Sequence, residues 1–342
     1  MSRPMFMNGR ILLRQHGGVR RYAHEVSERM ASATVLMPGS AKHPWSARLW
    51  EQGTLARASR DGVLLSVAHS GPLRHPHHVI VIHDLLALTS PTGVRRSYSR
   101  WLQGVLPALA KRSRQIVTGS VGVADEVADL FGVTRTSIEV VYPGVSDIFR
   151  ASDVNDARQS LGLDPGRPTV AALLDPTPRK NSHLVAALLR ELQHERPDVQ
   201  VVVAGNNRPP AFARHTSTRS IDRSGFVDLG AATDSELAAM YQSADVLVSL
   251  TASEGFGLPV AEAAACGAAV VTTPVPSAQE CLGEACAIID NPAAAKSAVL
   301  AVLDTPERRY EMGEQGKLAT HDLRWGHTAA SLEIIMQNSA QT

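Results

Sequence analysis

The sequence has little net charge, few cysteines and no long apolar run. Its 342 residues carry 34 Lys and Arg against 33 Asp and Glu, and the formal charge of +1 argues against general nucleic-acid binding. No apolar stretch reaches the roughly 18–20 residues that a transmembrane helix needs, and no secretory signal is visible. The cysteines have no metal-ligand spacing and cannot all pair, which favours a reducing, cytoplasmic location. They are Cys266, Cys281 and Cys286.

The rest of the composition is ordinary for a globular protein. Apolar residues make up 44% of the chain and charged residues 20%, and the length predicts two domains. Strand, loop and helix patterns alternate along the chain, which is typical of α/β domains. A Pro143-Gly144 turn and the polar run 151–156 predict the boundary between them. We therefore expect domains at 1–150 and 151–323, followed by a C-terminal helix at 324–342.

One strand–loop–helix unit carries the densest chemistry. Residues 245–250 form an apolar run that is typical of a strand covered on both faces. Residues 251–257 are polar and contain glycine, which predicts a loop. A helix then begins near Pro259, because the first helical position needs no backbone N–H, and it ends at Gly267. The free N–H groups at the start of this helix suit an anion such as a phosphate.

Two carboxylates mark this unit, Glu254 in the loop and Glu262 about one turn into the helix. Carboxylates accept hydrogen bonds from hydroxyl groups, and Gly255 and Gly257 let a ligand approach the backbone closely. Hydroxyls together with phosphates describe a sugar nucleotide. The alternative is the glycine loop of another nucleotide-binding domain. However, Gly255-x-Gly257 followed by Val260 departs from the GxGxxG dinucleotide pattern, which argues against a dehydrogenase.

The stretch SEGFGLPVAEA resembles the glutamate-x7-glutamate signature of the retaining glycosyltransferases of family four. The resemblance covers about residues 6–330 and implies the GT-B fold. In that fold two Rossmann-like doubly wound domains face each other across a cleft, and the C-terminal helix packs back on the first domain. The resemblance also implies that Glu254 lies against the donor sugar and that Glu262 holds the nucleotide ribose. The donor-binding residues between them are Gly255, Phe256, Gly257 and Leu258.

A second motif follows the predicted strand 169–174. The sequence DPTPRKN places Arg179 and Lys180 between the end of that strand and the start of a helix. Cleaving the bond to a nucleoside diphosphate leaves negative charge on the phosphate, and placed cations stabilise it. The resemblance implies this role for both side chains, whereas the alternative is a solvated charge pair. The strand departs from the family at 171–173, where Ala-Ala-Leu replaces an often-present glycine.

The N-terminal segment contains a predicted strand at 5–13, a Gly17-Gly18 turn and a helix at 19–30. The stretch NGRILLRQHGGVRRYAHEV resembles the first loop of the same family, in which the glycines touch the donor diphosphate from the other domain. The alternative is that Gly17 and Gly18 form only a tight connection. Arg20 and Arg21 fit either contacts to the acceptor or a phosphate, or a solvated helix face.

The predicted buried strand 79–82 ends at His83-Asp84. In open α/β sheets ligands bind outside the carboxyl ends of the strands. The resemblance accordingly places His83 near the acceptor and the reacting carbon. The alternative is a histidine that hydrogen-bonds the loop, with Asp84 as a helix cap. A metal site is not expected at the upstream histidines, because Pro76 breaks them into a turn. These are His75, His77 and His78.

The family's nucleobase site implies a role for Gly205, after the predicted strand 199–204, and for Phe226 and Val227 in the next short strand. Backbone groups would recognise the base there. A basic helix is predicted at 95–114, with six Lys or Arg among apolar residues. An ordinary amphipathic surface helix is the commoner explanation, and the alternative is peripheral contact with an anionic membrane or a lipid-phosphate acceptor.

These patterns, taken with the resemblance, predict a metal-independent hexosyltransferase that uses a nucleoside-diphosphate sugar and no other cofactor. The resemblance implies that the anomeric configuration is retained. The acceptor would be a hydroxyl of a glycan, a lipid-linked molecule or a small molecule. The first domain most resembles surface-polysaccharide mannosyltransferases, which favours GDP-mannose over a UDP-sugar. The alternatives are a UDP-sugar enzyme of the same fold and an inactive sugar-nucleotide or glycan-binding subunit. The predicted catalytic residues are Glu254, Arg179, Lys180 and His83.

Overall fold

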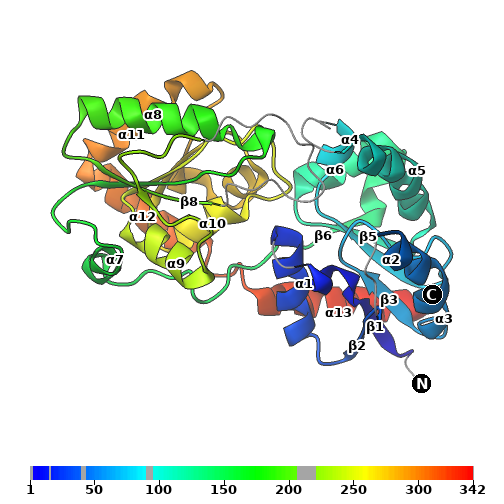
Figure 1. The fold of residues 1–342 in the computed structure, drawn as a ribbon. Coiled ribbons are helices and arrows are strands. Elements are labelled where there is room, and N and C mark those ends of the chain that lie inside the picture. Colours follow the sequence, from blue (N-terminus) through cyan, green and yellow to red (C-terminus); the bar gives the residue numbers. More distant parts are fainter. Residues whose placement is uncertain (1–2, 15–16, 40–43, 90–94, 206–220, 342) are drawn as a thin grey trace. The chain divides into compact units, whose positions relative to one another are not determined.

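The computed structural model describes residues 3–14, 17–39, 44–89, 95–205 and 221–341, with Pro44 and Trp45 described by their backbone alone. The chain divides into two compact units (Figure 1). Unit 1 comprises Met1–Ser90, Arg96–Gly144 and Leu323–Thr342, and unit 2 comprises Pro91–Arg95 and Val145–Asp322.

Unit 1 is built on a six-stranded parallel sheet in the order β2-β1-β3-β4-β5-β6. Its central strands consist largely of Val, Leu and Ile and are buried on both faces, as is typical of a parallel sheet covered by helices. The strands are β1 (Met5–Asn8), β2 (Ala33–Leu36), β3 (Val63–Ser66), β4 (His78–Ile82), β5 (Gln115–Thr118) and β6 (Ile138–Val140).

The helices of unit 1 connect these strands, and the last one comes from the far end of the chain. Helix α13 (Trp325–Gln341) contacts α1, β3 and β4, and Trp325 at its start is buried. A continuous helical stretch at 44–58 consists of α2, a π-helical turn and α3. The others are α1 (Gly18–Arg29), α2 (Pro44–Trp50), α3 (Ala56–Ala58), α4 (Leu86–Thr89), α5 (Arg96–Arg112) and α6 (Val121–Phe131).

Unit 2 repeats the architecture with a second six-stranded parallel sheet, in the order β12-β11-β10-β7-β8-β9. β7 lies between β10 and β8, with Val170 opposite Val246 on one side and Val201 on the other. The strands are β7 (Thr169–Leu173), β8 (Gln200–Ala204), β9 (Val227–Asp228), β10 (Val246–Ser249), β11 (Ala269–Thr272) and β12 (Cys286–Ile288).

One apolar core of unit 2 joins β7, β8, β10 and β11 to helices α8 and α11. Helix α9 begins with a capping box, in which the side chains of Thr233 and Glu236 each accept the other's backbone N–H. The helices are α7 (Val154–Ser160), α8 (Ser182–Glu195), α9 (Asp234–Ser243), α10 (Leu258–Ala265), α11 (Ala295–Leu303) and α12 (Pro306–Ala319).

One local prediction was wrong. The first strand ends at Asn8, not at residue 13, because the Asn8 side chain accepts the Arg10 N–H and starts a 3₁₀ helix at Gly9–Leu13. The polar run 151–156 includes the start of α7, which Asp153 caps. Residues 278–285 form π and 3₁₀ turns ahead of β12. The prediction of two doubly wound α/β halves is confirmed.

Candidate functional site

The sheet of unit 2 has a topological switch point between β7 and β10. From β7 the chain moves outward through β8 and β9, whereas from β10 it moves the opposite way through β11 and β12. Ligands of open α/β sheets bind in the crevice outside the carboxyl ends of the strands at such a point. Arg179 and Lys180 follow β7, and Glu254 follows β10, so the sheet order brings all three to this place.

Glu254 is held between the two cations. Its Oε1 lies 2.8 Å from Nη1 of Arg179 and also accepts a hydrogen bond from Nζ of Lys180. The carboxylate is 14% exposed. Burial by itself would raise the pKa of Glu254, but the charges and hydrogen bonds of Lys180 and Arg179 outweigh burial and lower it. Glu254 is therefore a carboxylate at neutral pH.

The two loops that carry these groups are joined by hydrogen bonds to backbone carbonyls. The Ala252 N–H donates to the carbonyl of Arg179 over 2.7 Å. The Asn181 side chain donates to the carbonyl of Leu250 over 2.8 Å, and Asn181 itself is left-handed with φ +51°. Asn adopts the left-handed conformation more readily than most residues, so Asn181 is a local sequence signal for this turn. Asn181 and Ser253, whose carbonyl accepts Nη1 of Arg179, were missed by the sequence reasoning.

The glycine loop between Glu254 and α10 is anchored from the opposite side by Ser277. The Ser277 N–H donates to the carbonyl of Phe256 over 2.8 Å, and its hydroxyl donates to the carbonyl of Gly257 over 3.2 Å. Gly257 has φ +99°, and a Cβ there would lie 2.8 Å from the Ser277 hydroxyl oxygen. The loop conformation therefore requires glycine at 257.

Helix α10 begins at Leu258 with Pro259 in its first turn, and Gly267 lies just beyond its end with φ +88°. Both ends agree with the sequence-based expectation. Glu262 is the fifth residue of α10 and is 3% exposed. Its placement inside a buried helix face next to the loop is consistent with a binding role, which stays a prediction. The roles predicted for Gly255, Phe256 and Leu258 also stay predictions.

The predicted nucleobase residues lie at the end of β8 and at the start of β9, the edge strand of the unit 2 sheet. Gly205 follows β8 with φ +135°, and a Cβ there would lie 2.2 Å from the carbonyl oxygen of Leu174. Its N–H donates to the carbonyl of Gly230. Val227 pairs with Val202 inside the sheet, and Phe226 packs against the core. This hydrogen bond places Gly230 next to Gly205. The roles predicted for Gly205, Phe226 and Val227 in base recognition stay predictions.

In unit 1 the His83 ring is fixed by its neighbours. Its Nε2 donates to the carbonyl of Val67 over 2.8 Å, and its ring meets Tyr22 edge-on at 4.7 Å between centroids. The His83 N–H donates to Nε2 of His69 over 2.7 Å. Burial and the nearby His69 lower the pKa of His83 to about 4, so the imidazole is neutral at pH 7. The catalytic role predicted for His83 stays a prediction.

Asp84 and the glycine pair occupy ordinary capping positions in unit 1. The Asp84 carboxylate accepts the N–H of Leu86 at the start of α4 over 3.1 Å, as the structural alternative expected. Gly17 precedes α1 with φ +121°, and Gly18 is its first residue. No atom of the described residues lies within 4 Å of a Cβ built at either glycine. Their predicted contact with the donor diphosphate is untested.

The three upstream histidines are engaged in structural hydrogen bonds. His75 bonds to Ser59, His77 to the carbonyl of Ser339 in α13, and His78 to the hydroxyls of Ser66 and Ser113. Within the described ranges no three His, Cys, Asp or Glu side chains are placed to share a metal ion. Searching the same residues, we find no helix long and apolar enough to cross a membrane.

Two sequence families match adjacent parts of the chain. Residues 55–147 match the family described as "Glycosyltransferase Family 4", and residues 153–319 match "Glycosyl transferases group 1". A curated relative, the D-inositol 3-phosphate glycosyltransferase of Segniliparus rotundus, is 29% identical over 236 residues, which are 66% of this chain and 52% of that protein. The chain spans about half the length of the first curated relatives it matches.

Solved structures share the whole fold at low identity. The sucrose-phosphate synthase of Thermosynechococcus elongatus has a TM-score of 0.76 at 16% identity, covering 99% of this chain and all of that one. HepE of Anabaena in complex with UDP and glucose has a TM-score of 0.74 at 13% identity, covering 97% and 98% of the two chains. The predicted GT-B fold class is therefore confirmed.

Proposed function

We propose that the chain, whose fold is GT-B and whose parts match the group 1 and family 4 glycosyltransferases, transfers a hexose from a nucleoside-diphosphate sugar to a hydroxyl group. We further propose that the anomeric configuration is retained. The observation that carries the proposal is the cluster of Arg179, Lys180 and Glu254 at the switch point of the unit 2 sheet.

The two cations fit the chemistry of a departing nucleoside diphosphate. Cleavage of the anomeric C–O bond leaves an extra negative charge on the terminal phosphate, and fixed cations in a partly buried site stabilise that charge in the transition state. In the structure Arg179 and Lys180 instead face Glu254. When a diphosphate binds, it shares these cations, and the Glu254 carboxylate is freed to accept hydrogen bonds from the sugar hydroxyls.

The proposed reaction proceeds on one face of the sugar. The diphosphate leaves, the acceptor hydroxyl attacks the anomeric carbon from the same side, and the leaving phosphate oxygen takes the hydroxyl proton. Glu262 would hold the ribose, and Gly17, Gly18 and His83 would contribute from unit 1. Because Arg179 and Lys180 supply the positive charge, we propose that the reaction needs no metal ion.

The donor base has two candidates. The sequence resemblance favours GDP-mannose. A UDP-sugar is favoured by the similar fold of HepE, whose structures contain UDP with glucose, or UDP-glucose. The proposed acceptor is a hydroxyl of a glycan, a lipid-linked molecule or a small molecule. A cytoplasmic location with peripheral contact of helix α5 at the inner membrane face is also a proposal, which sedimentation with anionic liposomes tests.

Ligand-dependent unfolding temperatures test the donor site before any acceptor is known. A ligand at about 100 times its Kd adds roughly 2.7 kcal/mol of stability, which raises the midpoint by several degrees. We expect GDP or UDP, but not NAD, to raise it, and Glu254→Gln to leave this rise in place while lowering sugar transfer by about 10²–10³-fold. Transfer that continues in excess EDTA supports the metal-free mechanism, and loss of transfer in EDTA contradicts it.

The second candidate function is an inactive binding subunit. It predicts a midpoint rise with a nucleoside diphosphate, or with a glycan, without release of diphosphate from any donor sugar. A rise with NAD alone contradicts both candidates and supports a dehydrogenase.

A further inference from the structure

Among the residues that the structure describes, two that are not glycine have a positive φ, and each lies at the carboxyl edge of one sheet. They are His69, at +55°, and Asn181, at +51°. Asn181 joins the two loops of the candidate site in unit 2. A residue other than glycine is held in the left-handed region only by its surroundings, and such strained residues cluster at functional sites. His69, which follows β3, therefore marks the corresponding edge of unit 1.

His69 and His83 join the loops that follow β3 and β4, which are neighbouring strands. Nε2 of His69 accepts the backbone N–H of His83 over 2.7 Å and that of Asp84 over 3.4 Å. In the opposite direction, Nε2 of His83 donates to the carbonyl of Val67 over 2.8 Å. Each imidazole thus holds the backbone of the other loop, at the edge where ligands of open α/β sheets bind.

These hydrogen bonds determine which ring nitrogen carries the proton. Burial lowers the pKa of His69, although the charge of Asp84 opposes this, and the ring is neutral at pH 7. Because Nε2 of His69 accepts, its proton lies on Nδ1. The His83 ring is also neutral and its Nε2 donates, so its Nδ1 carries a lone pair. This lone pair can accept a hydrogen bond from a hydroxyl group, which a phosphate oxyanion cannot donate.

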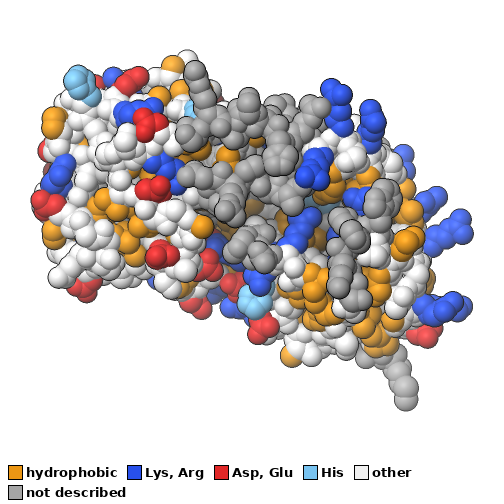
Figure 2. Space-filling model, viewed as in Figure 1, with side chains coloured by type: hydrophobic (Ala, Val, Ile, Leu, Met, Phe, Trp, Pro, Cys, Tyr) orange, Lys and Arg blue, Asp and Glu red, His pale blue; other side chains and the backbone are white. Residues whose placement is uncertain are grey.

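Aromatic contacts hold the His83 ring as well. Tyr22, which is 2% exposed, meets this ring edge-on, and the Tyr22 ring meets Trp325 edge-on at 5.4 Å between centroids. The centroid of the His69 ring lies 5.3 Å from that of His83. Histidine side chains take up little of the surface drawn in Figure 2, whereas His69 and His83 are both partly exposed. A partly exposed imidazole that is firmly held suits contact with a ligand.

We propose that His69 is a positioning residue: by accepting the backbone N–H of His83, it holds Nδ1 of His83 in place to accept a hydrogen bond from a substrate hydroxyl. This inference rests on the proposed function, in which His83 contributes from unit 1. A displacement of about 1 Å can lower a rate about 10²-fold, so the loss of one such hydrogen bond has a measurable effect. The alternative is that residue 69 only completes the turn after β3, and the two roles require different side chains.

Gln and Asn separate the two roles at position 69. The Gln side chain is long enough to place its amide oxygen near the position of Nε2, and this oxygen accepts hydrogen bonds. The Asn side chain adopts a positive φ more readily, but it ends near the position of Nδ1 and is too short to reach the N–H of His83. His69→Ala removes the acceptor altogether. The control is His24→Ala, which removes an exposed imidazole from α1 of the same unit.

The first measurement is ¹⁵N NMR of the imidazole nitrogens in the full chain without substrate. The spectra report which nitrogen of each ring carries the proton, and His83→Gln identifies the signals of His83. We expect a single form of His83, protonated at Nε2, in the wild type, in His24→Ala and in His69→Gln. In His69→Asn and His69→Ala we expect a mixture of the two neutral ring forms, because the loop that carries His83 has lost its tie.

The second measurement is the rate of diphosphate release from the donor sugar, which gives kcat and KM. We expect kcat to fall about 10–100-fold in His69→Asn and His69→Ala while the donor KM stays unchanged, and we expect His69→Gln to keep most of the rate. His24→Ala should match the wild type. Rates are compared per folded molecule, taken from the unfolding curve of each variant, which excludes a folding defect as the cause.

A greater loss in His69→Gln than in His69→Asn overturns the inference, because residue 69 then serves only the turn. Unchanged His83 signals in all three variants at position 69 overturn it as well. If the NMR signals follow the expected order but no sugar nucleotide is turned over, the link between His69 and His83 stands while the proposed function fails. Normal sugar transfer in all three variants removes the positioning role and leaves the proposed function intact.

Discussion

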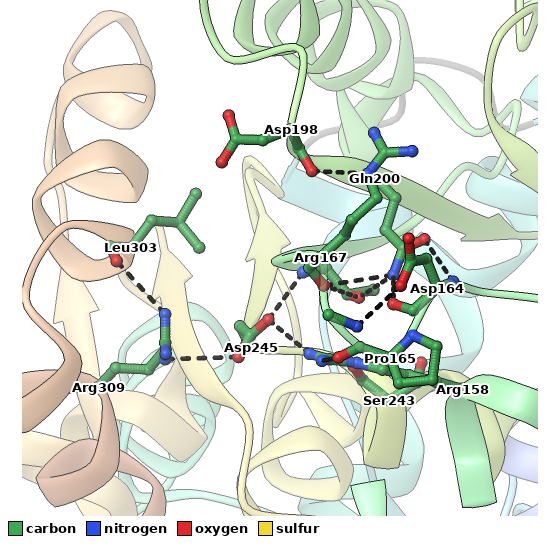
Figure 3. A network of polar contacts seen from close by, with 12 residues as sticks. Arg158, Asp164, Pro165, Arg167, Asp198, Gln200, Ser243, Asp245, Leu303 and Arg309 are labelled. Atoms are coloured by element: carbon green, nitrogen blue, oxygen red, sulfur yellow. Dashed lines mark hydrogen bonds and ion pairs between the residues drawn. The ribbon is translucent and has the colours of Figure 1, made fainter. Parts of the chain in front are cut away.

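The strand β10 has a carboxylate at each end, and each carboxylate lies between two cations. Asp245 precedes the strand and lies between Arg158 and Arg309 (Figure 3). Glu254 follows the strand and lies between Arg179 and Lys180. The residue types are nearly the same at both ends, but their structural surroundings differ. The amino end stabilises the fold, whereas the carboxyl end is the candidate binding site.

At the amino end of β10 the polar groups satisfy one another. Asp245 accepts from Nη2 of Arg158 over 2.6 Å and from the backbone N–H of Thr169 over 2.7 Å. The remaining guanidinium nitrogens of Arg158 donate to the carbonyls of Ser243 and Pro165. This network joins α7, α9 and β7, and Arg309 adds α12. Its bonds therefore stabilise the packing of unit 2.

Among the residues that the structure describes, the cations at the carboxyl end meet one side chain and one carbonyl. Arg179 contacts Glu254 and the carbonyl of Ser253, and Lys180 contacts Glu254. The side chains of Arg179 and Lys180 are 32% and 21% exposed, against 9% for Arg158. Partners of this kind can be exchanged for a ligand without unfolding the chain. The comparison therefore predicts that activity and stability respond to different ends of β10.

The largest expected effect is the loss of sugar transfer in Glu254→Gln. A placed charged group at the reacting centre contributes about 10²–10³-fold to the rate, and we expect a fall of that order. Initial rates of diphosphate release measure it. Glu314→Gln, at an exposed ion pair in α12, is the control and should keep the wild-type rate. Equal rates for the Glu254 and Glu314 variants would contradict the site.

The second effect is a loss of stability in Asp245→Asn. Removing one partner of a largely buried ion pair leaves Arg158 uncompensated and costs about 3 kcal/mol. Urea unfolding measures this loss. Below the unfolding transition, the rate per folded molecule should equal that of the wild type. A variant that keeps its stability but loses its rate would show that the amino end acts in the reaction.

The third effect concerns the loop that presents Glu254. Gly257→Ala places a methyl group 2.8 Å from the Ser277 oxygen at φ +99°, which costs about 1–3 kcal/mol of strain. Because the loop must shift, transfer should fall together with stability. Gly162→Ala is the matched control, since Gly162 has φ +67° in open space. Gly162→Ala should lose less stability than Gly257→Ala and should keep the wild-type rate of sugar transfer.

The smallest effect is a pH dependence of stability. Because the pKa of Glu254 is lower in the folded chain than its ordinary value of 4.5, its ion pairs stabilise the fold above that pH. The contribution is lost as the pH falls through the folded pKa. The difference in unfolding free energy between the wild type and Glu254→Gln should be constant from pH 7 to about 5.5 and shrink below 4.5. If the difference in unfolding free energy grew as the pH fell, the pKa of Glu254 would be raised, not lowered, in the folded chain.

Much of the site was predictable because its local signals are strong. The loop 251–257, the helix start at Pro259 and the end at Gly267 follow from residue preferences within one turn. The predicted strand at 5–13 was too long for a local reason as well. The Asn8 side chain caps a 3₁₀ helix and ends the strand despite the apolar residues that follow. His69, which accepts the N–H of His83, had no local signal, because a lone histidine is compatible with many environments.

The sequence by itself determined the repeating strand–loop–helix units, their caps and the identities of the charged residues. These depend on the backbone preferences and side-chain periodicity of neighbouring residues. Only the tertiary structure decided which charges meet. Lys180 and Glu254 are 74 positions apart and touch because β7 and β10 are adjacent. Arg10 and Ser70 touch because β1 lies beside β3. Strand order depends on long-range packing, which no local pattern specifies.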